Sequence, residues 1–472
     1  MLFGMRLVKT ISRKSLLAFG YPKLETYHPE LSVYDVGAVK VRMSPELPAC
    51  QIFYPVEKDS EKDHVDDVVP YYRPEAVEAL VDYLNGFGDG IMQMLNEKSH
   101  PLQNTYAIAP LMVDSNNGDS MKFPLVLFSH GLSGNMEMYS QICAQLASTG
   151  CVVAALEHED GSASYSTKLL KDGTVEAIPY KQPLPNAEVP YSRKKVLDFR
   201  TPMLEQRVNE LRRIYNYFRD EKTSVDETIT TNCYDSNSRL VRKILAIADP
   251  TKLHLVGHSF GGATQLLAAQ KWIMEGHDEK VQTEATTEAH PMSMRLSDSE
   301  NPATTSTMTI DTSTSSSSPP IPQSVMVFDA WNFSLSDEVL NRGISIPSSP
   351  TGSTTAAPTI VSVLSEQWER TNPEKEQTLQ FLRNCPPSTT YSYLARDSVH
   401  QSISDTECYL PSIVARKLEN LGPSEERHQT VRAVVEEFVR RTKSSGNDCS
   451  SKKRGSDDNT LIELPLRNIH IG

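Results

Sequence analysis

The sequence predicts an α/β fold in which a mostly parallel sheet is covered by helices on both faces. Two observations support this prediction. Apolar runs of strand length recur along the chain without polar interruption, which is typical of strands that are buried on both faces. Stretches with the period of an amphipathic helix separate these runs, and such strand–helix–strand alternation indicates a parallel sheet.

Five continuous apolar runs are predicted as strands, and four periodic stretches as helices. The predicted strands are FPLVLFS (123–129), CVVAALEH (151–158), LHLVGHS (253–259), SVMVFDA (324–330) and APTIVSVLSE (357–366). The first three helices are predicted at 138–148, 201–219 and 262–274. A fourth follows from apolar residues that return at helical spacing near the end, namely Val431, Val434, Val435, Phe438 and Val439.

Charge and cysteine content exclude several classes of protein. The chain of 472 residues has a formal net charge of -13, and its two basic clusters, at 193–195 and 452–454, are short. We therefore expect no nucleic-acid partner. The seven cysteines include no Cys-x-x-Cys pair, which indicates free thiols in a reducing compartment and no zinc site. No run approaches the roughly 18 apolar residues of a membrane-spanning helix.

The N-terminal leader, predicted as residues 1–45, begins with a basic segment. Arg6, Lys9, Arg13 and Lys14 stand among apolar residues, and the first acidic residue is Glu25. This composition is typical of a mitochondrial-type transit peptide or an interfacial helix, and equally of an unstructured basic leader. The expected location is intracellular and cytoplasmic, with peripheral membrane association or organelle targeting as alternatives.

One domain is expected over residues 46–442, with a Ser/Thr-rich insertion at about 277–322. Twelve of the twenty residues from Asn301 to Pro320 are Ser or Thr. Such a stretch buries too little apolar surface to offset the entropy lost on ordering, so we expect it to be disordered. Residues 443–472 are expected to form a polar C-terminal tail.

A serine flanked by glycines lies where the predicted strand 253–259 gives way to a helix, in Gly257-His258-Ser259-Phe260-Gly261. In the α/β-hydrolase fold a serine on such a turn is the nucleophile, because the glycines let the chain cross itself while the hydroxyl projects from the sheet. The alternative is an ordinary tight turn. The strand–turn–helix context favours a nucleophile at Ser259.

A serine nucleophile needs a base, and the base needs an acid to orient it. In the α/β-hydrolase order the acid comes next and the histidine last. Asp329 directly follows the apolar run 325–328, with Asp337 and Glu338 as alternatives. Three histidines follow Asp329: His400, His428 and His470. His400 is chosen largely by elimination, because His428 precedes the charged last helix and His470 is two residues from the end.

The oxyanion of an ester hydrolase must be held by backbone amides. The loop FSHGLSGN follows the predicted strand 123–129 and contains a His-Gly pair of the kind that lies beside the nucleophile in esterases. We expect the amides of Leu132 and Phe260 to supply the oxyanion hole. As side chains, both residues are equally consistent with simple packing.

Several separated motifs carry a resemblance to a known family. They are FSHGL (128–132), VAALEHEDGSAS (153–164), LVGHSFGGAT (255–264), FDAWNF (328–333) and SVHQSISD (398–405). From about Cys50 to Val439, excluding the insertion, the chain resembles the platelet-activating factor acetylhydrolases of the plasma and intracellular type-two kind. The resemblance implies an α/β-hydrolase fold, a Ser/Asp/His triad at Ser259, Asp329 and His400, and no metal or cofactor.

Two positions depart from the family pattern. Glu159 stands where the family has arginine, and Asp397 stands where a small residue is expected before SVHQ. These departures leave the triad intact but bear on substrate preference. His158 and Asp160, in the same loop as Glu159, are expected to have a structural role, because two such residues without further ligand spacing rarely bind metal.

The resemblance implies a phospholipid substrate whose short or oxidised acyl ester at the middle glycerol carbon is cleaved. A general short-chain carboxylesterase, or a non-catalytic binding protein on the same fold, are the alternatives. A lipid at an interface needs an apolar docking surface, and the stretch 84–95 (LNGFGDGIMQML) is a candidate that is equally consistent with a packed helix. Peripheral contact with a membrane or lipoprotein surface is therefore expected.

Overall fold

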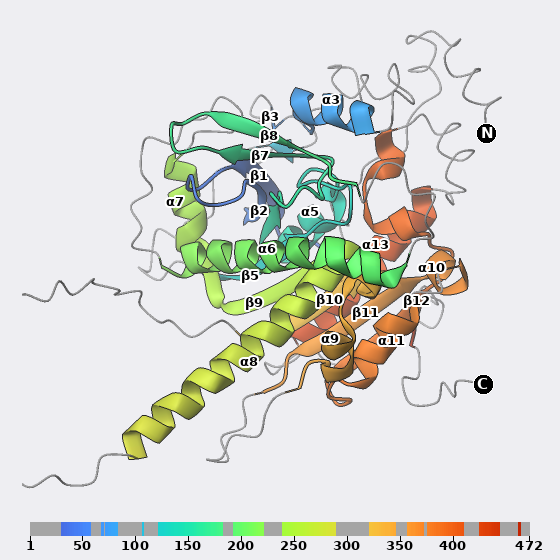
Figure 1. Cartoon of the computed structure of the whole chain (residues 1–472). Helices are drawn as coiled ribbons and strands as arrows, with labels where there is room; N and C mark the ends of the chain where they lie inside the picture. Colours follow the sequence, from blue (N-terminus) through green and yellow to red (C-terminus); the bar gives the residue numbers. More distant parts are fainter. Residues whose placement is uncertain are drawn as a thin grey trace, which may run out of the picture.

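The predicted parallel sheet is present at the centre of the protein. The computed structural model describes residues 30–57, 68–69, 71–83, 106–107, 121–182, 192–220, 238–288, 321–345, 356–371, 375–409, 424–443 and 461–463. Within these ranges, eleven strands form one sheet in the order β13-β12-β11-β10-β9-β5-β6-β2-β1-β4-β3, and β7 and β8 form a separate hairpin (Figure 1). The fold class is α/β, as the sequence predicts.

The strands and helices have the following bounds. The strands are β1 (Asp35–Val41), β2 (Cys50–Val56), β3 (Val68–Val69), β4 (Tyr106–Ala107), β5 (Phe123–Ser129), β6 (Val152–Leu156), β7 (Tyr165–Leu169), β8 (Val175–Pro179), β9 (Ala248–His258), β10 (Ser324–Phe328), β11 (Thr359–Ser365), β12 (Thr390–Ala395) and β13 (Leu461–Glu463). The helices are α3 (Pro74–Tyr83), α5 (Ser140–Ser148), α6 (Arg193–Arg219), α7 (Ser238–Ile247), α8 (Phe260–Glu288), α9 (Asp337–Arg342), α10 (Glu366–Thr371), α11 (Lys375–Arg383) and α13 (Ser424–Lys443). Short 3₁₀ turns lie at η3 (Asn332–Ser334), η4 (His400–Ile403) and η5 (Thr406–Tyr409).

The centre of the sheet is parallel. β5 pairs in parallel with β6 and β9, β10 pairs with β9 and β11, and β11 pairs with β12. Antiparallel pairs occur toward the two edges, where β2 joins β6 and β13 joins β12. Because the carboxyl ends of parallel strands share one edge, the residues that follow β5, β9, β10 and β12 are brought to the same side of the sheet.

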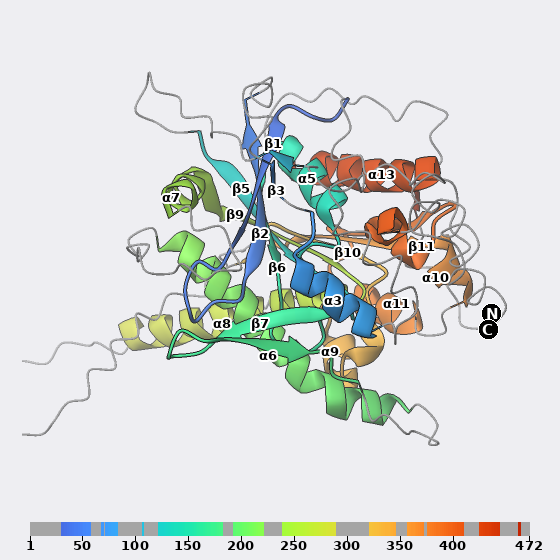
Figure 2. The same cartoon turned by 90° about the horizontal axis from the view of Figure 1, so that it is seen from above.

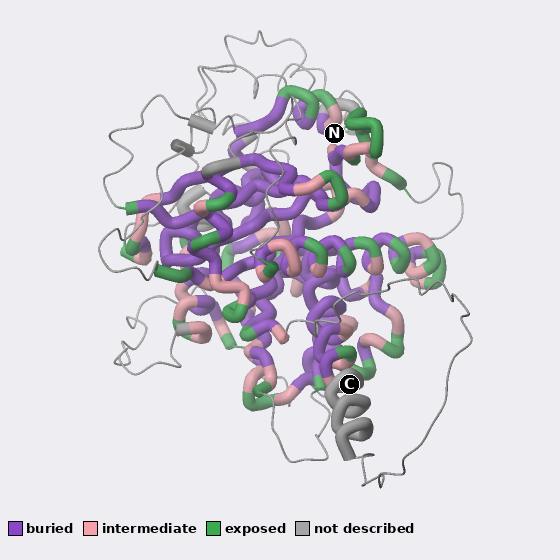
Figure 3. The backbone as a smooth tube through the Cα atoms, turned by 90° about the vertical axis from the view of Figure 1, so that its left-hand side faces the viewer, coloured by how far each residue is buried: buried purple, intermediate pink, exposed green. Residues whose placement is uncertain are grey.

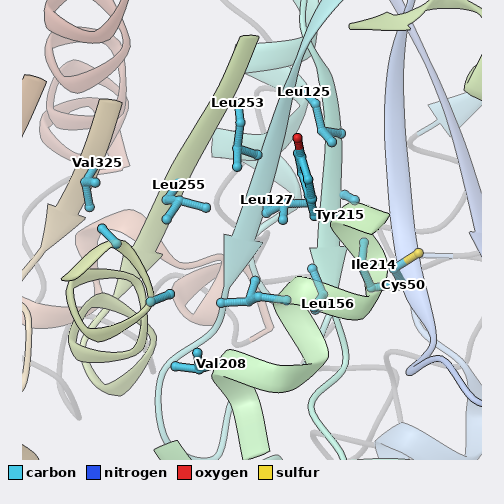
Figure 4. Close-up of a cluster of buried hydrophobic side chains, with 14 of the residues drawn as sticks. Cys50, Leu125, Leu127, Leu156, Val208, Ile214, Tyr215, Leu253, Leu255 and Val325 are labelled. Atoms are coloured by element: carbon cyan, nitrogen blue, oxygen red, sulfur yellow. The ribbon is translucent and has the colours of Figure 1, made fainter. Parts of the chain in front are cut away.

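Helices cover both faces, which explains why the strands are continuously apolar. Figure 2 shows α6 and α8 on one side of the sheet and α5 and α13 on the other. Leu125 and Leu127 of β5 belong to the same buried cluster as Val208 and Ile214 of α6 (Figure 4). The alternate residues of β5 pack in a second core with α5 and α13. Side chains alternate across a strand, so burial on both faces demands an apolar residue at every position.

Two helices are longer than the sequence predicts. α6 begins at Arg193 rather than at 201, because the Ser192 hydroxyl accepts from the Lys195 amide and the helix runs through Pro202. α8 continues to Glu288, into the stretch predicted as a disordered insertion from about 277. Residues 277–288 contain no glycine or proline, and polar residues such as Glu, Lys and Gln are good helix formers, so composition alone does not end the helix.

Both predicted boundaries of the domain need correction. β1 lies inside the stretch predicted as a leader, yet it pairs with β2 over its whole length and is almost entirely buried. β13 lies inside the predicted C-terminal tail and pairs with β12. Short strands at the ends of a chain are stabilised by the sheet they join, so their local sequence carries little signal.

Several predicted features lie outside the described residues. They are the basic segment at the N-terminus, the docking stretch 84–95, the Ser/Thr-rich run 301–320 and His470. Buried residues fill the interior and exposed ones lie on the outer sides of the helices (Figure 3). Within the described ranges, none of the helices is long and apolar enough to cross a membrane.

Candidate active site

Ser259 occupies the turn between β9 and α8 and has a strained backbone. Its φ is 56°, in the left-handed region that residues other than glycine rarely adopt. Hydrogen bonds hold it there: the Ser259 amide donates to the Phe328 carbonyl at 2.9 Å, and its own carbonyl accepts from the Trp331 amide at 2.9 Å. Strain of this kind persists only where surrounding structure imposes it, and it clusters at functional sites.

The two glycines around Ser259 are required by contacts between backbone segments. A Cβ on Gly257 would lie 2.5 Å from the Gly261 carbonyl oxygen, so the chain crosses itself too closely for a side chain. A Cβ on Gly261 would overlap the carbonyl group of Ser129 at the end of β5. The Gly-x-Ser-x-Gly spacing therefore builds a tight strand-to-helix turn of the kind that carries the nucleophile in the α/β-hydrolase fold, and an ordinary surface turn does not need these glycines.

Asp329 lies at the carboxyl end of β10 and is fully buried. Its Oδ1 accepts from the Ser365 amide at 2.7 Å and its Oδ2 from the Ser365 hydroxyl at 2.6 Å. The alternatives lie elsewhere: Asp337 is an exposed residue in the first turn of α9 that pairs with Arg193, and Glu338 pairs with Arg342. Of the three acids, Asp329 is the one that touches a histidine.

That histidine is His400, whose Nδ1 lies 3.1 Å from Asp329 Oδ2. His400 begins η4 after β12, and its side chain is 23% exposed. The Gln367 side chain accepts from the His400 amide at 3.0 Å. His428 lies far along the chain in α13, and its side chain is outside the described part. The structure thus brings together the acid and the histidine that the sequence predicts.

A second histidine, His258, lies beside His400 and links it to the loop after β5. The two imidazole centroids are 4.5 Å apart. His258 Nδ1 lies 2.9 Å from the Tyr139 hydroxyl, which also accepts from the Gly131 amide at 3.1 Å. The Tyr139 hydroxyl can donate to His258 Nδ1 or accept from it, so this bond joins the two side chains in either tautomer of His258. Burial holds the pKa of His258 well below 6.5, so this ring is neutral.

The contacts of Tyr139 also bear on which backbone amides could donate to a substrate oxyanion. The Gly131 amide is engaged by Tyr139, and a Cβ on Gly131 would lie 3.1 Å from Ser259 Cβ. The loop after β5 therefore passes directly beside Ser259, and the next amide along it belongs to Leu132. Phe260 is the first residue of α8, where the amides of a helix have no acceptor within the helix.

A cluster of buried polar side chains from α6 and the loop after β6 packs against the loop after β5. His158 Nε2 lies 2.8 Å from the Ser129 hydroxyl, and His158 Nδ1 lies 2.7 Å from Glu210. Arg207 donates to the His130 carbonyl at 2.8 Å and pairs with Asp160 at 2.9 Å. The predicted structural role of His158 and Asp160 agrees with these contacts, since both side chains are fully engaged.

Burial and neighbouring charges shift the pKa values of this cluster in opposite directions. Burial, and next the Arg207 cation, hold the pKa of His158 well below 6.5. Burial, and next the Asp160 charge, raise the pKa of Glu210 from 4.5 to about 8. In contrast, the pKa of Asp160 is lowered: burial opposes ionisation, but Arg207 outweighs it. The His158–Glu210 pair is thus kept close to neutral.

Donor atoms for a metal come together at the same place as the predicted triad. Within the described residues, the ring nitrogens of His258 and His400 and a carboxylate oxygen of Asp329 lie within 4.8 Å of one another. The carboxylate is already used by Ser365 and His400. The arrangement is therefore suited to orienting an imidazole.

The two departures from the family pattern have local explanations. Glu159 pairs with Arg42 at 2.6 Å. A positive charge therefore still lies beside this loop, but it comes from the residue that follows β1. Burial raises the pKa of Glu159 to about 7. Asp397 has a φ of 52°, and aspartate is one of the few residues other than glycine that tolerates this conformation.

Some residues of the site carry no signal in the sequence. Ser365, which binds both Asp329 oxygens, is the polar end of an apolar run, and Trp368 follows in a short charged helix. Arg207 and Glu210 occur in a helix whose alternating charges are typical of a solvated surface. Only the fold shows that this side of α6 lies against the loop after β5.

Comparison with known proteins finds relatives named as platelet-activating factor acetylhydrolases. The family model described as platelet-activating factor acetylhydrolase, isoform II, matches residues 32–279, a range that includes Ser259 and ends before Asp329. A platelet-activating factor acetylhydrolase of Bos taurus is 37% identical over 144 residues, which are 30% of this chain and 31% of that protein. The one of Gallus gallus is 28% identical over 208 residues, 42% of this chain and 46% of that protein. The matched segments thus span a third to a half of these relatives.

A solved structure supports the fold independently. A ferulic acid esterase from Streptomyces cinnamoneus superposes with a TM-score of 0.51, covering 94% of this chain and 100% of that one, at 13% identity. At this identity the likeness shows a common fold and nothing about substrate. The mostly parallel sheet, the strand-to-helix elbow and this superposition together establish the α/β-hydrolase fold.

Proposed function

The chain belongs to the platelet-activating factor acetylhydrolase isoform II family, and from this premise we propose that it is a serine esterase acting on phospholipids. Its substrates in this proposal are glycerophospholipids with a short or oxidised acyl chain at the middle glycerol carbon. The products are a lysophospholipid and a carboxylate. The reaction needs no cofactor or metal.

One observation carries the proposal. The His400 imidazole contacts the buried Asp329 carboxylate at 3.1 Å, next to a serine held at a φ of 56° on a glycine-flanked elbow. A binding protein needs neither the strained serine nor the buried acid under a partly exposed histidine. Nucleophile, acid and base follow the chain order of this fold. Ser259 and Asp329 come directly after β9 and β10, and His400 lies five residues past the end of β12.

The chemistry assigned to these residues is acyl transfer in two steps. In the first, the Ser259 oxygen attacks the ester carbonyl while His400 takes the hydroxyl proton, and Asp329 stabilises the imidazolium that forms. His400 then returns the proton to the departing glycerol oxygen. In the second step a water molecule attacks the acyl-enzyme in the same way and releases the carboxylate.

We assign to the backbone amides of Leu132 and Phe260 the stabilisation of the negative charge that develops on the carbonyl oxygen. The engagement of the Gly131 amide by Tyr139 supports Leu132 as the donor from the loop after β5. Phe260 is the first residue of α8, which supports its amide as the second donor, because the positive end of the helix adds to the stabilisation of an oxyanion there. Removing one such donor typically slows turnover by about 10²–10³-fold.

A substrate panel tests the proposal. The purified chain would be given phosphatidylcholines with acyl chains of increasing length at the middle carbon, and p-nitrophenyl acetate as a water-soluble ester. We expect hydrolysis of the acetylated phospholipid, with kcat/KM falling as the chain lengthens. Hydrolysis of the nitrophenyl ester alone would indicate a general carboxylesterase. No turnover of either ester would leave a non-catalytic protein on this fold.

A further inference from the structure

The histidine of the site is contacted on its ring face by a tryptophan. The Trp368 ring stacks on the His400 imidazole with centroids 4.3 Å apart and an angle of 15° between the planes. The His258 ring lies against His400 as well, at 4.5 Å and 42°. One edge of the imidazole is bound through Nδ1 to Asp329. His400 is therefore held by two aromatic rings and one carboxylate.

Trp368 comes from a short segment that contacts both partners of the acid–histidine pair. This segment, Ser365–Trp368, spans the end of β11 and the start of α10. Ser365 binds the Asp329 carboxylate, and the Gln367 side chain accepts from the His400 amide at 3.0 Å. The Trp368 amide donates to the Ser365 hydroxyl at 3.1 Å. One stretch of chain thus sets the position of the acid, of the histidine backbone and of the histidine ring.

We propose that Trp368 is a positioning residue for His400, which holds the imidazole plane parallel to its indole face and favours the cationic form of the ring during proton transfer. The proposal rests on the proposed serine-hydrolase function. It assigns Trp368 a part in the reaction without contact to the substrate. The acid and the nucleophile keep the roles given above.

The physical basis is the charge that appears on His400 during the reaction. When the proton leaves the Ser259 oxygen for His400 Nε2, the neutral imidazole becomes an imidazolium. The face of an indole carries negative charge density and attracts a cation whose centre lies within about 6 Å. His258 does not oppose this as a second cation, because burial keeps it neutral. The stack therefore stabilises the transition state more than the resting enzyme.

Two substitutions and a readout that does not depend on the ester test the proposal. The readout is the rate at which a fluorophosphonate probe labels Ser259, since this reaction uses the same proton transfer. We expect Trp368→Leu to slow labelling, and kcat on p-nitrophenyl acetate, by about 3- to 30-fold with little change in KM. Trp368→Phe keeps an aromatic face and should recover most of the rate. Glu369→Leu, a change on the same helix at a residue whose carboxylate pairs with Lys375 rather than with His400, should leave the labelling rate unchanged.

Fluorinated tryptophan separates the charge effect from shape. Site-specific replacement of Trp368 by mono-, di- and tetrafluorotryptophan withdraws electron density from the ring at nearly constant size. The labelling rate should fall stepwise with the number of fluorine atoms while the melting temperature stays constant. These variants retain the ring stack, so they still test the charge effect of Trp368 if Trp368→Leu does not fold.

Labelling of Trp368→Leu at the wild-type rate would overturn the proposal, as would a flat fluorotryptophan series. A wild-type chain that is labelled at Ser259 but cleaves no phospholipid would remove the proposed substrate and leave the role of Trp368 intact. A wild-type chain that is not labelled at all would overturn both.

Discussion

Within the described residues, two clusters combine a serine, a histidine and a carboxylate, and only one of them has the geometry that we propose for catalysis. In the first, His400 Nδ1 lies 3.1 Å from Asp329 next to Ser259 on the elbow. In the second, His158 lies 2.8 Å from the Ser129 hydroxyl and 2.7 Å from Glu210. The distance between histidine and carboxylate is therefore shorter in the second cluster than in the first.

Access and backbone geometry distinguish the clusters. Ser129, His158 and Glu210 are completely buried, whereas Ser259 is 8% exposed and the His400 side chain 23%. Ser129 is the last residue of a regular strand, while Ser259 is held in the left-handed region. A nucleophile must reach a substrate, so the strained elbow is the feature that gives a serine this position.

Charge distinguishes them as well. A general base must accept a proton, but His158 is deeply buried near the Arg207 cation, and both hold its pKa well below 6.5. Glu210 is kept near its neutral form, so it offers little charge to an imidazolium. His400 instead has a carboxylate on one edge and an aromatic face against its ring. In our proposal the same three residue types therefore give a base in one place and a structural support in the other.

The largest expected effect is the loss of the elbow hydroxyl. Ser259→Ala should reduce ester hydrolysis by about 10⁴-fold or more, because nucleophile, base and acid act as a unit. The matched change Ser129→Ala removes a buried hydrogen bond worth about 1 kcal/mol and should keep turnover within about tenfold. Turnover of both variants on one ester, with circular dichroism to confirm folding, makes the comparison. A Ser259→Ala variant with a tenth of the normal rate would remove Ser259 from the mechanism.

The next effect concerns the acid. Asp329→Asn should keep the fold and lower kcat by about 10⁴-fold, because the amide cannot stabilise the imidazolium and can select the wrong tautomer of His400. Asp337→Asn is the matched control, since this residue is exposed and bound to Arg193. Turnover of the two variants on the same ester is the measurement. If Asp337→Asn lost most of its turnover while Asp329→Asn kept the wild-type rate, Asp329 would not be the acid.

The elbow and the acid were predictable because their signals are local. Ser259 and Asp329 each come directly after an unbroken apolar run, and parallel strands bring such residues to one edge. His400 was reached by elimination, and the structure places it against Asp329. Its catalytic role, like that of the other two, stays a proposal.

The rest of the site depends on contacts between distant segments. Trp368 and Ser365 contact residues that lie more than thirty positions away along the chain, and nothing in their own neighbourhood indicates a partner. Arg207 and Glu210 have the charge pattern of a surface helix, and only the packing of α6 under the loop after β5 buries them. The predicted end of α8 is also wrong, because the helix continues into a polar stretch whose residues favour helix.

A smaller effect is expected where the two clusters meet. Gly261 of the elbow packs against the Ser129 carbonyl, so the Cβ of Gly261→Ala would overlap backbone that cannot move aside cheaply. We expect a loss of about 1–3 kcal/mol in the free energy of unfolding and a fall in kcat of about 10²-fold as Ser259 shifts. Gly173→Ala is the contrasting change: its φ of 84° strains any side chain but no atom lies near the added Cβ, so it should lower stability and leave kcat unchanged. Chemical denaturation and turnover measure the two effects, and a fully active Gly261→Ala would contradict the steric argument.

The smallest effect on turnover, and the sharpest contrast with Asp329→Asn, is expected for Glu210→Gln. The same acid-to-amide change should here leave kcat within about threefold, because the buried carboxyl is held near its neutral form, which the amide imitates. Its oxygen can still accept from the Gln206 side chain and the Glu159 amide, and its NH₂ can donate to His158.

Stability of this variant should depend on pH in a defined direction. The pKa of Glu210 is raised in the folded protein, to about 8 from an ordinary 4.5, chiefly by burial. Its contribution to stability is therefore fully present below about pH 4.5 and is lost as pH rises toward 8. Glutamine does not titrate, so Glu210→Gln should become more stable relative to the wild type between pH 5 and pH 8. Denaturant unfolding of both proteins across this range measures the difference. A constant difference would show that Glu210 is ionised in the folded state, and a large loss of turnover would mean that the buried cluster takes part in catalysis after all.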